Sequence, residues 1–220
     1  MHAPYEITVP DPGAGHRLGP DARQELRSQI RQADRGGAAA VLLSVAGDAW
    51  HQDADDDTGR SAQQVGVEGH RLVTALFAVR TPVVVQLAGR VSGLGLGLAL
   101  ACDLRFGTGE TTLSVGSPET AAALLGGTSW LLTHRAGAAV AAHLSWTGQE
   151  LTAAEARALT LLSGVSSDGS AAREAAERLA RLPGGATTAL KRSLNGRLRA
   201  DLEEQLDYDS WLAAVARREV

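Results

Sequence analysis

The chain has 220 residues, 44% hydrophobic and 21% charged, which suits one globular domain with a buried core and argues against disorder. Its formal net charge is -4 with acids and bases interspersed, so we expect neither a nucleic-acid-binding nor a membrane-surface protein. The single cysteine, Cys102, excludes a disulfide within the chain. Because no targeting or membrane-spanning segment is evident, we expect a cytoplasmic protein.

The first half of the chain predicts two cycles of strand and helix. Residues 5–9 and 40–45 have the character of strands, and Ala22, Leu26, Ile30 and Ala33 recur between them at helical spacing. A capping box at Ser61 and Gln64 predicts a second helix, which Pro82 ends. Residues 83–87 form a Val-rich run, typical of a strand that is covered on both faces.

The segment after this strand is the most informative one. Ser92-Gly-Leu-Gly-Leu-Gly97 lies between the strand and an apolar run that ends at Asp103, so a glycine turn opens a helix. A lone carboxylate, Glu119, follows sixteen residues later. This layout suits an oxyanion site at the helix N-terminus with one proton carrier. The alternative is that the glycines only let the helix pack closely against the strand.

Other functions of a glycine-rich turn fit less well. The third glycine of a dinucleotide-binding motif would fall on Leu98, and no Lys-Ser or Lys-Thr pair follows as in a phosphate-binding loop. Ser92 lacks the flanking glycines of a nucleophile elbow. The aspartates of residues 47–59 do not have the EF-hand spacing, so we expect a solvated loop, with His51 in it, and no metal site.

The second half is predicted to be mainly helical. Residues 104–106 and 111–115 are short extended segments, Thr152 and Glu155 form a capping box, and residues 161–165 are a candidate last strand. The remaining predicted helices span residues 171–182, 186–199 and 202–215. Because Pro183-Gly-Gly185 separates the last two helices from the body, we divide the chain into a core of residues 1–182 and an oligomerisation arm of residues 183–220.

The order of short motifs resembles the crotonase (enoyl-CoA hydratase/isomerase) superfamily over roughly residues 40–200. The motifs are Pro82-Val-Val-Val-Gln-Leu-Ala-Gly89, the glycine cluster, Leu98-Ala-Leu-Ala-Cys-Asp103, Ser117-Pro-Glu119, Gly126-Gly-Thr128 and Leu144-Ser-Trp-Thr-Gly148. The resemblance implies an α/β fold, a crotonase-like spiral of strand-strand-helix units with a C-terminal helical region. It also implies homotrimers or hexamers and an acyl-CoA thioester substrate, with no cofactor beyond the coenzyme A of that substrate.

The resemblance assigns three catalytic groups. The backbone N–H groups of Leu94 and Ala54 would hold the thioester oxyanion, since Gly47-Asp-Ala-Trp-His-Gln-Asp-Ala-Asp55 is similar to the family's first donor loop. Glu119 would move the proton, and burial against apolar walls would help it hold that proton.

Five further residues are candidates for substrate binding. Gly93 and Gly95 shape the turn, and Trp50 is either a core residue or flanks the pocket. Asp53 stands where the family prefers glycine, close to the thioester. Lys191, the only lysine, is either a cation near the CoA phosphates or simply solvated.

The chain also departs from the family pattern. Gly97 stands where the classical hydratase has its second glutamate, and the segment from Glu119 to Gly126 is short. These features resemble the small crotonase-like proteins that accompany a type III polyketide synthase in making 3,5-dihydroxyphenylacetyl-CoA, a precursor of the antibiotic building block 3,5-dihydroxyphenylglycine. We therefore expect a lyase of secondary metabolism that dehydrates or hydrates a CoA thioester. The alternatives are a non-catalytic partner of the synthase and an acyl-CoA isomerase or decarboxylase.

Overall fold

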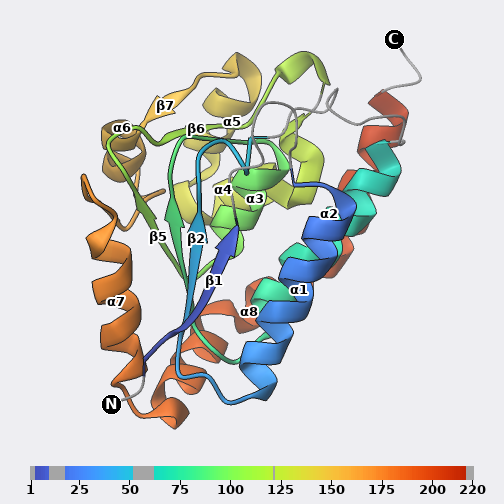
Figure 1. Ribbon diagram of the computed structural model, residues 1–220. Helices are drawn as coiled ribbons and strands as arrows, with labels where there is room; N and C mark the ends of the chain where they lie inside the picture. Colours follow the sequence, from blue (N-terminus) through green and yellow to red (C-terminus); the bar gives the residue numbers. More distant parts are fainter. Residues whose placement is uncertain (1–2, 10–17, 52–61, 121, 217–220) are drawn as a thin grey trace.

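The computed structural model describes residues 3–9, 18–51, 62–120 and 122–216, and its centre is a parallel β-sheet (Figure 1). The five strands lie in the order β1-β2-β3-β5-β8, and each pairs in parallel with its neighbour. They are β1 (Tyr5–Val9), β2 (Val41–Val45), β3 (Val83–Leu87), β5 (Leu104–Gly107) and β8 (Gly164–Val165). The predicted strands are confirmed, although β8 is shorter than residues 161–165.

Helices cover both faces of this sheet, as Figure 1 shows. On one face lie α1 (Pro20–Arg35), α2 (Ala62–Ala78) and α3 (Leu94–Ala101), which share the main hydrophobic core with the sheet. On the other face, α7 (Ser170–Ala180) packs small alanines against Leu42 and Val84. Apolar residues on both sides of the sheet explain the continuous Val-rich run of β3.

A second, three-stranded sheet carries the site of interest. It has the order β4-β6-β7, in which β4 (Arg90–Ser92) is parallel to β6 (Thr112–Ser114) and β6 is antiparallel to β7 (Leu151–Thr152). The end of β4 therefore leads directly into the glycine turn and α3. This arrangement fixes the start of α3 at the edge of a small sheet.

The rest of the chain is helical, as predicted. Two 3-10 helices, η1 (Pro118–Thr120) and η2 (Ala122–Gly127), lead into α4 (Thr128–Ala136), α5 (Ala138–Thr147) and α6 (Ala153–Ala158). The capping box of Thr152 and Glu155 is confirmed at the start of α6. Among the described residues, no helix combines the length and hydropathy needed to cross a bilayer.

The prediction of two separate C-terminal helices is wrong, although the region is helical. Residues 184–216 form a single helix, α8 (Gly184–Ala216), which lies along α2 in Figure 1. Its residues Leu202 and Leu206 are buried in the main core, so α8 packs on the body of its own chain. This burial on one side maintains the helix through residues 200 and 201, where the predicted pair of helices had its break.

Candidate functional site

The glycine turn before α3 presents a backbone donor. Gly93 has φ 52° and ψ -122°, a conformation that a residue with a Cβ rarely adopts, and Leu94 is the first residue of the helix. The N–H groups in the first turn of a helix have no partner within the helix. The Leu94 N–H has none elsewhere within the described residues, so it is available to a developing negative charge.

A second segment, residues 47–51, lies against this turn and β4. The Asp48 carboxylate accepts hydrogen bonds from the Arg90 N–H at 2.8 Å and from its guanidinium at 2.9 and 3.1 Å. The backbone hydrogen bond from Arg90 is the main reason that the pKa of Asp48 lies below its usual value. The ion pair therefore stays charged near neutral pH and attaches the segment to the small sheet.

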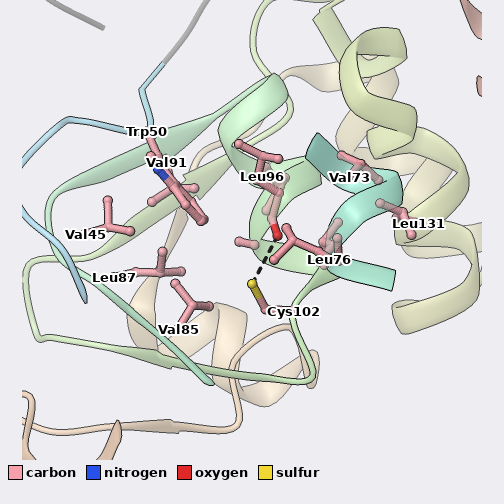
Figure 2. Close-up of a cluster of buried hydrophobic side chains, with 14 of the residues drawn as sticks. Val45, Trp50, Val73, Leu76, Val85, Leu87, Val91, Leu96, Cys102 and Leu131 are labelled. Atoms are coloured by element: carbon pink, nitrogen blue, oxygen red, sulfur yellow. Dashed lines mark hydrogen bonds between the residues drawn. The ribbon is translucent and has the colours of Figure 1, made fainter. Parts of the chain in front are cut away.

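Trp50 anchors the other end of this segment. Its carbonyl oxygen accepts the Ser92 N–H at 3.1 Å and lies so close to Gly95 that a Cβ there would clash with it. The Trp50 side chain is 1% exposed and lies with Val91 and Leu96 in the core (Figure 2). Trp50 is thus a core residue, and its expected place beside the pocket is corrected. Gly95 is needed because it admits the Trp50 carbonyl.

His51 is not a solvated loop residue, contrary to the sequence-based expectation. It is half-buried, and its Nδ1 lies 2.8 Å from Ser92 Oγ, while Ser92 is 1% exposed. The His51 N–H also donates to the Asp48 carbonyl oxygen at 2.9 Å. An imidazole and a hydroxyl group therefore lie at the entry to α3, two residues before the Leu94 donor.

The position of the missing glutamate is filled by backbone and a threonine. A Cβ at Gly97 would lie 2.7 Å from Thr128 Oγ1 and 3.0 Å from the Gly126 carbonyl oxygen. The Thr128 hydroxyl is fixed there, because it hydrogen-bonds to the Gly93 carbonyl at 3.0 Å and the Leu125 carbonyl at 2.7 Å. The structure has no room for a glutamate at residue 97.

Glu119 lies on η1, and its side chain is exposed. The expected burial against apolar walls is therefore not found within one chain. Among the described residues, the Glu119 N–H donates to the Ser117 hydroxyl oxygen at 3.3 Å. The assignment of Glu119 as proton carrier stays a prediction.

The remaining predicted site residues divide into two groups. Ala54 and Asp53 lie outside the described residues, so the second oxyanion donor stays a prediction. Lys191 is 5% exposed, and its Nζ donates to Asp103 Oδ2 at 2.7 Å and to the Thr81 carbonyl at 3.0 Å. This buried ion pair replaces the expected cation near the CoA phosphates, because the ammonium group joins α8 to the end of α3.

Two further residues of the site, Ser92 and Thr128, were not expected from the sequence. Ser92 was considered only as a nucleophile, although a serine at the end of a strand and next to a glycine turn can bond a neighbouring loop. Thr128 belonged to a recognised motif, but no local pattern indicates that its hydroxyl holds the glycine turn.

Comparison with known proteins shows to which family the chain is related. The family model "Enoyl-CoA hydratase/isomerase" matches residues 8–216. A fatty acid oxidation complex subunit alpha of Shewanella loihica is 32% identical over 149 residues, which are 64% of this chain and 21% of that protein. A putative enoyl-CoA hydratase/isomerase, YhaR of Bacillus subtilis, is 28% identical over 166 residues, 72% of this chain and 65% of the relative. The alignments thus span less than two thirds of these relatives.

Solved structures of enoyl-CoA hydratases resemble this fold. The crystal structure of an enoyl-CoA hydratase from Bacillus halodurans superposes with a TM-score of 0.81 and 19% identity, covering 96% of this chain and 90% of that one. At 19% identity the structural likeness shows the crotonase fold alone. The family is shown by the family model, which covers nearly the whole chain. The chain therefore belongs to the enoyl-CoA hydratase/isomerase family.

Proposed function

We propose that the protein removes water from, or adds water to, an acyl-CoA thioester through an oxyanion-stabilised enolate. The observation that carries this proposal is the Leu94 N–H, which has no partner among the described residues and lies at the N-terminus of α3. Residues 47–51, which lead into the predicted second donor loop, are attached beside it through Asp48 and Trp50. A thioester carbonyl between the two loops would meet donors from both.

The chemistry follows from where charge develops. Removing the α-proton of a thioester places negative charge on the carbonyl oxygen, and a well-aimed backbone donor contributes about 3 kcal/mol to its stabilisation. In this proposal the donors are the Leu94 and Ala54 N–H groups, and Glu119 carries the α-proton. The bound acyl group, or a neighbouring subunit of a trimer or hexamer, would cover the exposed Glu119 side chain.

The substrate class is narrowed by the shape of the site. Thr128 and Gly126 fill the place of the second glutamate, so activation of water by two carboxylates is not available. A 3-hydroxyacyl thioester that dehydrates readily, such as a polyketide-derived one on the way to an aromatic ring, places a smaller demand on the site. We therefore propose a role in secondary metabolism, at a step such as 3,5-dihydroxyphenylacetyl-CoA formation.

A second candidate function is that of a non-catalytic partner which stimulates a type III polyketide synthase. Exposed apolar residues on α8 favour a protein contact, because Leu190 and Leu194 are 58% and 73% exposed and lie one turn apart. The exposed Glu119 side chain also agrees with this alternative. An isomerase or decarboxylase would use the same oxyanion site with another acyl group.

Mass spectrometry of CoA thioesters tests the proposal. A panel of enoyl-, 3-hydroxyacyl-, malonyl- and polyketide-derived thioesters is incubated with wild-type, Glu119→Gln and Glu150→Gln proteins. Glu150 is an exposed glutamate next to β7 and serves as the matched control. We expect conversion by the wild-type and control proteins and at least a 100-fold loss with Glu119→Gln. No conversion by any protein, together with stimulation of a synthase by Glu119→Gln, would leave the partner function.

A further inference from the structure

His51 and Ser92 form a polar pair beside the Leu94 donor. The His51 Nδ1 lies 2.8 Å from Ser92 Oγ, and His51 is half-buried while Ser92 is 1% exposed. Ser92 is the last residue of β4, and Leu94 is the first residue of α3. The imidazole therefore lies at the same helix N-terminus that offers the oxyanion donor.

Several independent contacts fix the backbone segment that carries His51, and the bond to Ser92 orients its imidazole. Ser92 donates its N–H to the Trp50 carbonyl, and the absence of a Cβ at Gly95 lets that carbonyl rest on the first turn of α3. The ion pair of Asp48 and Arg90 attaches the preceding residues to β4. Among the described residues, Asp48 is close enough to His51 for the two charges to interact. Such a preorganised side chain suits proton transfer better than a flexible one.

Dehydration of a thioester needs a second group that transfers a proton. Dehydration moves two protons, one from the α-carbon and one to the departing hydroxyl group. The site has one assigned proton carrier, Glu119, and the position of a second carboxylate is closed at Gly97 by Thr128. Imidazole groups titrate near neutral pH, so they can give and take protons under working conditions.

We propose that His51, held by Ser92, is the second proton-transfer residue of the thioester site. This inference rests on the proposed function. In the dehydration, Glu119 takes the α-proton, the C–H electrons form the new double bond, and the bond from the β-carbon to oxygen breaks. The leaving hydroxyl group takes a proton from the protonated imidazole and departs as water. Solvent then returns a proton to His51 and removes one from Glu119.

The competing explanation is that the hydrogen bond only fastens residues 47–51 to β4. His51→Asn separates the two explanations, because an amide in the place of Nδ1 can still bond to Ser92 Oγ but cannot transfer a proton. Ser92→Ala removes the bond and leaves the imidazole. His143→Asn is the matched control, since His143 is an exposed histidine on α5.

Turnover of the panel thioester that the wild-type protein converts is measured from pH 5.5 to 8.5, with thermal unfolding in parallel. We expect His51→Asn to lose at least 100-fold in kcat and to lose one limb of the pH profile, with unchanged melting temperature. Ser92→Ala should lose about 10-fold in kcat and keep that limb. His51→Asn with wild-type kcat and pH profile overturns the proposal and leaves the proposed function intact.

A binding measurement covers the case in which a variant does not fold. Acetoacetyl-CoA, whose enol form resembles the enolate, is titrated into the ¹⁵N-labelled wild-type protein, and its affinity is measured by calorimetry. We expect the His51 imidazole signals to shift at saturation and those of His143 to stay in place. Binding without a shift of the His51 signals overturns the role of His51 alone. No binding of acetoacetyl-CoA or of any panel thioester overturns the proposed function and this inference together.

Discussion

Replacing Asp209 with asparagine should make the protein more stable at neutral pH. Asp209 lies on α8, is 1% exposed and packs against Gly127. Its Oδ1 accepts a hydrogen bond from Gln205 Nε2 at 2.7 Å, whereas Oδ2 has no partner within the described part of the chain. Burial raises the pKa of Asp209 from 3.8 to about 6, against the opposing effect of the Gln205 hydrogen bond.

The sign and size of the stability change follow from the difference between the Asp209 pKa in the folded and in the unfolded protein. Because the folded pKa is raised, folding favours the protonated carboxyl group, and stability falls as the pH rises from about 4 to above 6. The gap between 3.8 and about 6 corresponds to ~3 kcal/mol at about 1.4 kcal/mol per pH unit. At pH 5 about half of this cost is present, and at pH 7 nearly all of it.

Equilibrium unfolding in urea measures the effect at pH 5, 6, 7 and 8. We expect the stability gained by Asp209→Asn to increase by about 1.3 kcal/mol between pH 5 and pH 7 and to change little above pH 7. Asp201→Asn is the control, because Asp201 is an exposed aspartate on the same helix. A gain that is the same at all four pH values would show that the Asp209 carboxyl group does not titrate as argued.

Three further predictions concern stability at pH 7 and are measured by the same urea unfolding. Gly97→Ala should destabilise the protein by about 1–2 kcal/mol, because the added methyl group overlaps neighbouring oxygens. This loss outweighs the better helix propensity of alanine, and a gain in stability would contradict the packing. Lys191→Met should lower the free energy of unfolding by about 3 kcal/mol, because it leaves the Asp103 carboxylate without its cation. Arg192→Met, at an exposed position, should change this free energy little, and equal effects of the two substitutions would refute the role of the buried pair. Glu6→Gln should cost less than about 1 kcal/mol, since its ion pair with α7 is half exposed, and a larger loss would show a stronger link of β1 to α7.

Much of the fold could be predicted because its signals are local. Val-rich runs bounded by Pro82 and glycine indicated buried strands, and the periodicity around Leu26 and Ile30 indicated α1. The same holds for the glycine turn, since a strand, a turn that requires Gly93 and an apolar helix follow one another within some twenty residues. Local patterns thus placed the Leu94 donor correctly at the start of a helix.

The remaining features depend on contacts between distant segments. Nothing near Lys191 indicates that its ammonium group is buried, because its partner Asp103 is 88 residues away in sequence. The His51 and Ser92 pair spans 41 residues, and local polarity suggested a solvated loop. The break predicted between residues 199 and 202 was overridden because Leu202 and Leu206 are buried along one side of the helix. Tertiary packing decided each of these cases.

The absence of a side chain at residue 97 has a packing reason in this structure. Gly126 and Thr128 lie directly against Gly97, and Thr128 holds the glycine turn through the Gly93 carbonyl. Gly126 and Thr128 therefore occupy the space that a side chain at residue 97 would need. Restoring a glutamate at residue 97 alone would displace Thr128 and release the turn that aims the Leu94 N–H. A second proton carrier has to come from another segment, and His51, in the segment that follows β2, bonds Ser92 just before the same turn.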